Sequence, residues 1–75
     1  MNISDTMIHI NESLSKEALS SLEDALREVD GVVSPRFNAG KEHLLLIAYD
    51  ADKTNTGVLL EKTRAAGYTA QLVGM

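Results

Sequence analysis

Residues 19–33, LSSLEDALREVDGVV, decide the fold, because they contain a helix, its end and the start of a strand. Four apolar residues recur at spacings of three, four and three: Leu19, Leu22, Leu26 and Val29. This spacing is typical of the buried face of an amphipathic helix. Asp30-Gly31 predicts the end of the helix, since glycine readily adopts the left-handed conformation that follows many helices. Val32-Val33 then begins a strand.

The segments on either side complete an alternation of strands and helices. We predict strands over residues 7–11, 32–38, 42–49 and 68–73, and helices that Ser15 and Asn55 cap, the second running through residue 66. Pro35 lacks a backbone donor, which predicts that its strand lies at a sheet edge. The order is βαββαβ, and we expect a ferredoxin-like α+β fold with two helices on one face of a four-stranded antiparallel sheet. Residues 7–75 are predicted to form one domain, and residues 1–6 a flexible N-terminus.

Composition excludes several classes of function. The 75 residues include 11 acidic and 7 scattered basic side chains, a net charge of -4 that disfavours binding to nucleic acid. There is no cysteine, which excludes disulfides, thiolate metal sites and cysteine nucleophiles. The start carries no basic, apolar leader, and the longest apolar run, 44–49, is too short to span a bilayer. We therefore expect a cytoplasmic protein without membrane contacts. Because no histidine base lies near a serine, we expect no enzyme.

Several motifs resemble those of heavy-metal-associated domains, the family of the copper chaperones. Residues 22–32 are similar to the first helix and its exit in that family, and Tyr49-Asp50, Lys53-Thr54 and Ala66-Gly67-Tyr68 match later landmarks at the family's spacing. The resemblance implies the ferredoxin-like fold for residues 7–73. In the family, a Met-x-Cys-x-x-Cys loop after the first strand chelates copper(I) or zinc.

The same resemblance places the degenerate metal loop on this sequence. The methionine of the motif falls on Ser13 and the two cysteines on Ser15 and Ala18, while Tyr68 matches a tyrosine near the metal loop of many bacterial copper chaperones. A serine hydroxyl is a hard, protonated group and alanine offers no ligand, so soft ions lose their thiolates here. We expect no metal site and no cofactor.

One strand has more apolar residues than a half-covered sheet requires. Antiparallel sheets with one solvated face usually alternate polar and apolar side chains, yet residues 44–48 read LLLIA. Aligned with the family, Leu45 and Ile47 face the core. The residues predicted to share the open face of the sheet are Met7, His9, Leu44, Leu46 and Ala48. Two leucines and a methionine there would expose on the order of 300 Å², the size at which an apolar patch tends to be an interface.

These observations predict a non-catalytic binding module that acts through contacts with a protein partner or with a second copy of the chain. An alternative is weak or partner-assisted binding or delivery of a heavy metal such as copper, through His9, His43, methionines or carboxylates. A third is small-ligand sensing as in ACT domains, which share the βαββαβ order. Those domains usually carry a glycine in the loop before the first helix, and residues 12–15 contain none.

Overall fold

The computed structural model describes residues 2–38 and 40–73, and within them the helices and strands follow the predicted order. The elements are β1 (Ile3–Ile10), α1 (Lys16–Arg27), β2 (Val32–Asn38), β3 (Lys41–Asp50), α2 (Thr56–Ala65) and β4 (Ala70–Leu72). The βαββαβ order is therefore confirmed. β4 is shorter than the strand predicted over residues 68–73.

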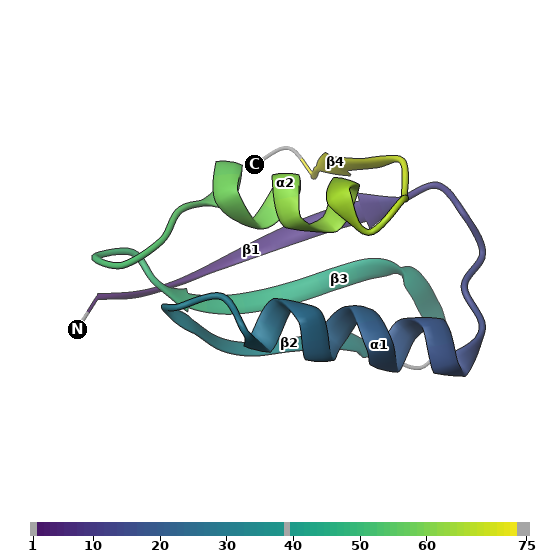
Figure 1. Ribbon diagram of the computed structural model, residues 1–75, viewed down its shortest axis with the longest axis horizontal. Helices are drawn as coiled ribbons and strands as arrows, with labels where there is room; N and C mark the ends of the chain where they lie inside the picture. Colours follow the sequence, from purple (N-terminus) through teal and green to yellow (C-terminus); the bar gives the residue numbers. More distant parts are fainter. Residues whose placement is uncertain (1, 39, 74–75) are drawn as a thin grey trace.

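The four strands form one antiparallel sheet in the order β2-β3-β1-β4. β2, which contains Pro35, lies at an edge, as its missing backbone donor predicts. Figure 1 shows both helices on the same side of the sheet, α1 beside β2 and α2 beside β1 and β4. Neither helix of the described residues lies on the other face of the sheet, so the predicted ferredoxin-like layers are confirmed.

β1 begins earlier than the sequence indicates. Residues 3–6 pair with residues 47–50 of β3, so the prediction of a flexible stretch over 1–6 is wrong for 3–6. The Asp50 carboxylate accepts the backbone N–H of Asp52 at 3.0 Å and that of Asn2 at 3.3 Å. These bonds favour the ionised form and hold the pKa of Asp50 below its ordinary value. Met1 and residues 74–75, for which we also made predictions, lie outside the described residues.

The predicted helix caps are confirmed. The Ser15 hydroxyl accepts the Ala18 N–H at 3.2 Å, and the Asn55 side-chain oxygen accepts the Val58 N–H at 3.0 Å. Each bond satisfies a donor that the first turn of a helix leaves free. Gly31 follows α1 with φ +101°, and a Cβ there would lie 2.8 Å from the Lys53 Cβ. Only glycine fits this position without displacement.

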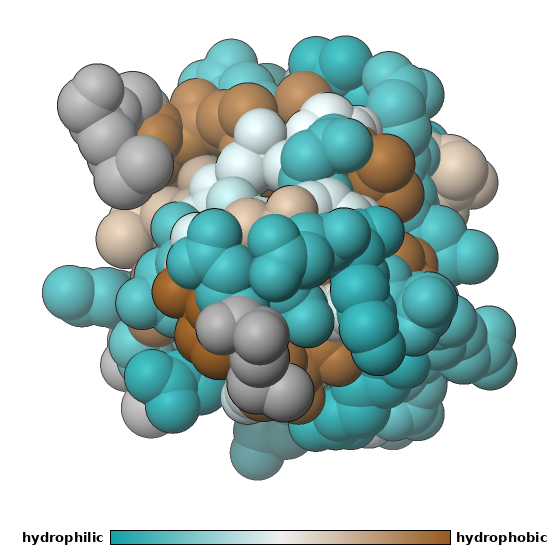
Figure 2. Space-filling model, turned by 90° about the vertical axis from the view of Figure 1, so that its left-hand side faces the viewer, coloured by the Kyte–Doolittle hydropathy of each residue, from teal (hydrophilic) through white to brown (hydrophobic). Residues whose placement is uncertain are grey.

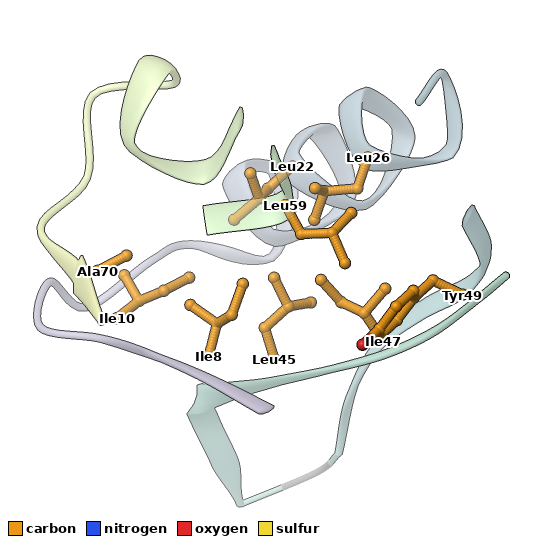
Figure 3. Packing of buried hydrophobic residues seen from close by; sticks show 9 residues of the cluster. All are labelled: Ile8, Ile10, Leu22, Leu26, Leu45, Ile47, Tyr49, Leu59 and Ala70. Atoms are coloured by element: carbon orange, nitrogen blue, oxygen red, sulfur yellow. The ribbon is translucent and has the colours of Figure 1, made fainter. Parts of the chain in front are cut away.

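The core lies between the helices and the sheet (Figure 3). It consists of nine buried apolar residues: Ile8, Ile10, Leu22, Leu26, Leu45, Ile47, Tyr49, Leu59 and Ala70. Leu22 and Leu26 come from α1, as the periodicity predicts. Leu45 and Ile47 are 0% and 1% exposed, which confirms the register predicted for β3. Burying a leucine stabilises the fold by about 1.5–3 kcal/mol.

Candidate functional site

The uncovered face of the sheet carries the residues predicted as an interface. Leu44, Leu46 and Ala48 alternate with the core residues of β3, and all three are half-buried. On β1, Met7 pairs with Leu46 and His9 pairs with Leu44, so these side chains are neighbours. We call these five residues the open face. The structure brings the five together on one surface; that this surface binds a partner stays a prediction.

Charged and polar residues flank the open face, and the sequence alone did not identify them. Asp5 of β1 and Ser34 of β2 pair with Ala48 from opposite sides, and Arg36 of β2 pairs with Leu46. Together with Leu46 and Ala48 they line a shallow depression of about 230 Å³. Extending the alternation of β1 back to Asp5 would have found the carboxylate. The position of Arg36 on this face could not be predicted in the same way, because it depends on the register of β2, which a bulge at Val33 shifts.

The two histidines lie together at one end of the open face. The rings of His9 and His43 are stacked, with centroids 5.9 Å apart and planes 19° apart. His43 donates from Nδ1 to the Ile10 carbonyl at 2.7 Å, which leaves its Nε2 free to accept. Nδ1 of His9 is buried and has no hydrogen-bond partner within the described residues. Alternation along β3 predicts that His43 lies on the opposite side of the sheet from Leu44 and His9, but at the start of β3 the two rings meet.

The degenerate metal loop lies between β1 and α1, and its side chains have structural roles. The Ser15 hydroxyl is engaged as the cap of α1, Ser13 is exposed and Ala18 is half-buried. Tyr68 is half-buried and packs against the core. The loop thus lies between β1 and α1, as the resemblance implies, but at the three motif positions it carries the hydroxyls of Ser13 and Ser15 and the methyl group of Ala18.

Glu12 fixes this loop to the segment before β4. Its carboxylate accepts the Thr69 backbone N–H with both oxygens, at 2.9 and 3.1 Å. The Asn11 N–H donates to the Thr69 carbonyl at 2.9 Å, so the two segments are joined twice. The bond from Thr69 holds the pKa of Glu12 below its ordinary value. The role of Glu12 could not be predicted from the neighbouring sequence, because its partner lies 57 residues away.

Within residues 2–38 and 40–73, no group of three or more histidine, aspartate or glutamate side chains is placed to hold a metal ion. No helix in this part of the chain is long and apolar enough to cross a membrane. The end of the molecule where β1 begins and β3 ends is mainly hydrophilic, and its hydrophobic atoms form several separate groups (Figure 2).

Comparisons with known proteins bear on the fold. No family model matches the chain, and no curated protein matches it significantly. Many solved structures are similar, and three of them illustrate the likeness, each over 93% of this chain. Oxidized MerP from Ralstonia metallidurans CH34 is 17% identical, with a TM-score of 0.82 and 96% of its chain covered. The N-terminal domain of a potential copper-translocating P-type ATPase from Bacillus subtilis, in its Cu(I)-loaded state, is 17% identical, with a TM-score of 0.83 and 86% covered.

The third structure, the CopZ metallochaperone, is 21% identical, with a TM-score of 0.79 and 100% of its chain covered. The likeness to all three structures extends over nearly the whole chain. At these identities the likeness concerns the backbone and not the ligands. The chain has the ferredoxin-like fold of heavy-metal-associated domains, in a sequence that contains no cysteine.

Proposed function

We propose that this protein is a non-catalytic binding module that acts through protein contacts on its open face and has no soft-metal site. The observation that carries the proposal is the position of Leu44, Leu46 and Met7 on the sheet face that the helices leave uncovered. A strand needs apolar residues only on its covered side to complete the core, so those on the other side add nothing to it. A partner that covers them removes that apolar surface from water.

The loop chemistry supports the part of the proposal that concerns metal. Copper(I) prefers polarizable sulfur ligands, and the loop offers the hydroxyls of Ser13 and Ser15 instead. The Ser15 oxygen is already the acceptor of the cap bond, and a metal ligand there would compete with the start of α1. We therefore propose that the scaffold is kept and that binding takes place on the sheet.

A photo-crosslinking experiment tests the proposed surface. A benzoylphenylalanine in place of Leu46 should give covalent adducts in cells, whereas the same group in place of Val58 should not. Val58 is the matched control, because it is apolar and 45% exposed but belongs to α2, on the covered side. Excess wild-type protein should suppress the adduct, and excess of a Leu44→Thr/Leu46→Thr variant should not. Adducts from both positions alike, or none from position 46, would contradict the proposal.

The proximity of His9 and His43 supports a second candidate, partner-assisted metal binding. Ligating histidines commonly donate their other ring N–H to a carbonyl, as His43 does to Ile10. Two imidazoles fill only part of the coordination sphere of zinc or copper(II), so a partner would supply the remaining ligands. Titration of the isolated chain with zinc should show weak binding that His43→Ala removes. If the chain kept a bound copper(I) ion in competition with a chelator whose affinity matches that of a copper chaperone, both candidate functions would be contradicted.

A further inference from the structure

Two opposite charges flank the apolar residues of the open face. Asp5 lies on β1, on one side of β3, and Arg36 lies on β2, on the other side. They are two residues apart along the strands, because Asp5 is level with Ala48 and Arg36 with Leu46. Both side chains are exposed, and neither forms an ion pair within the described part of the chain. With a carboxylate on one side of the apolar residues of β3 and a guanidinium on the other, this surface can be complementary to the same surface of a second copy.

The direction of the two-fold axis follows from these charges. If two copies faced each other across an axis perpendicular to the strands at Leu46, Arg36 would meet its own copy, which like charge opposes. With the axis along β3, the apolar residues of β3 face their own copies, and β1 of one copy lies over β2 of the other. Asp5 then lies two residues from Arg36 of the second copy, about 7 Å along the strand, which an extended arginine can span. Both ion pairs form at once because the interface is isologous.

We infer that the partner of the open face is a second copy of this chain, placed face to face with the axis along β3 and joined by two Asp5–Arg36 ion pairs. The inference rests on the proposed function and names its partner. The overall charge of -4 opposes association of two copies. On the face itself Asp5 and Arg36 balance, so the local contact is attractive while the remainder of the surface repels.

The area of the sheet determines the strength of this contact. At about 16 Å² of sheet per strand residue, the four strands present roughly 450 Å² to a facing copy. Stable complexes bury about 800 Å² on each partner, and weak, transient ones bury less than about 600 Å². We therefore expect a reversible dimer whose population rises through the micromolar to millimolar range.

Reversing one charge at a time tests the geometry. In Asp5→Lys both contacts of the dimer would join a lysine to Arg36, and in Arg36→Glu both would join a glutamate to Asp5. Each variant alone should raise the dissociation constant at least about tenfold, because like charges become opposed twice. An equal mixture of the two should form a heterodimer as tight as the wild type, since one of its contacts joins the new lysine to the new glutamate and the other joins Asp5 to Arg36. Sedimentation velocity measures the dissociation constant of each variant alone and, with one variant fluorescently labelled, that of the heterodimer in the mixture.

Lys62→Glu is the control for net charge, because Lys62 is exposed on α2, away from the open face. It changes the charge as Arg36→Glu does, and it should alter the dissociation constant by less than about threefold at physiological salt, where distant charges are screened. Circular dichroism of each variant verifies folding, which exposed substitutions leave nearly unchanged.

Three results would overturn the inference: a wild type that stays monomeric up to millimolar concentration, charge reversals without effect, or a mixture that does not recover association. The crosslinking experiment at position 46 separates this failure from failure of the proposed function. A monomeric chain whose position 46 still captures another protein, competed by wild type only, refutes the second copy and supports the open face. A monomeric chain with no adduct refutes both.

Discussion

Leu45 and Leu46 are neighbours in β3, yet the same substitution should affect them very differently. Leu45 is 0% exposed and points into the core with Ile8 and Ile47 (Figure 3). Leu45→Thr removes part of a buried side chain, which costs about 2–5 kcal/mol when the cavity stays open. It also buries a hydroxyl, which costs about 1–3 kcal/mol without a partner. A chain of 75 residues has a total stability of roughly 4–11 kcal/mol, so this variant should lose a large part of its stability.

Leu46→Thr should lower the free energy of unfolding by less than about 1 kcal/mol. Leu46 is half-buried on the open face, and threonine is well accepted in strands. Urea unfolding followed by circular dichroism measures both variants, at a protein concentration low enough that self-association adds nothing to stability. If Leu46→Thr destabilised the chain as much as Leu45→Thr, the two faces of β3 would be assigned incorrectly. The open face would then belong to the core, and the proposed function would lose its basis.

Four further predictions follow from single contacts. Leu26→Ala should cost about 2–5 kcal/mol, because Leu26 is fully buried in the core; a loss under 1 kcal/mol in a urea melt would place α1 in solvent. Gly31→Ala should cost at least about 1–2 kcal/mol for its positive φ alone, and an unchanged melt would contradict the close approach to Lys53. The folded pKa of Asp50 is lowered, so its contribution to the free energy of unfolding should be present above the unfolded pKa and lost as pH falls through the folded pKa. In Asp50→Asn the free energy of unfolding should depend less on pH in this range, and an unchanged dependence would exclude Asp50 as its source. Ser15→Cys with Ala18→Cys should create copper(I) affinity in a chelator competition; a folded variant without it would contradict the assignment of the loop.

The sequence predicted the elements whose signals are local. The periodicity of α1, the caps at Ser15 and Asn55, and the edge position of Pro35 all depend on residues close in the chain, and the structure confirms each. The register of β3 was also predictable, because its side chains alternate between the two faces. A strand with leucines on both faces would be ambiguous on its own. Aligning Tyr49-Asp50 with the family decided which leucines face the core.

The features that were missed depend on partners distant in sequence. Asp5 has a low preference for strands, and Ser4, Asp5 and Thr6 are extended because the long strand β3 continues beside them. Arg36 reaches the same surface because a bulge at Val33 shifts the register of β2. The meeting of His9 and His43 depends on ring orientation at the start of β3, which alternation of faces cannot predict.

Methyl NMR of the labelled protein is the measurement that tests most directly whether the open face is the binding surface. Spectra are recorded for the dilute chain, for the concentrated chain, and for the dilute chain in extract of the cells that make it. We predict that the methyl shifts of Met7, Leu44 and Leu46 change, while those of Leu22 and Leu45 in the core and Val58 on α2 stay constant. Shifts that change at Val58 while the open face stays constant, or no change under any of these conditions, would contradict the account.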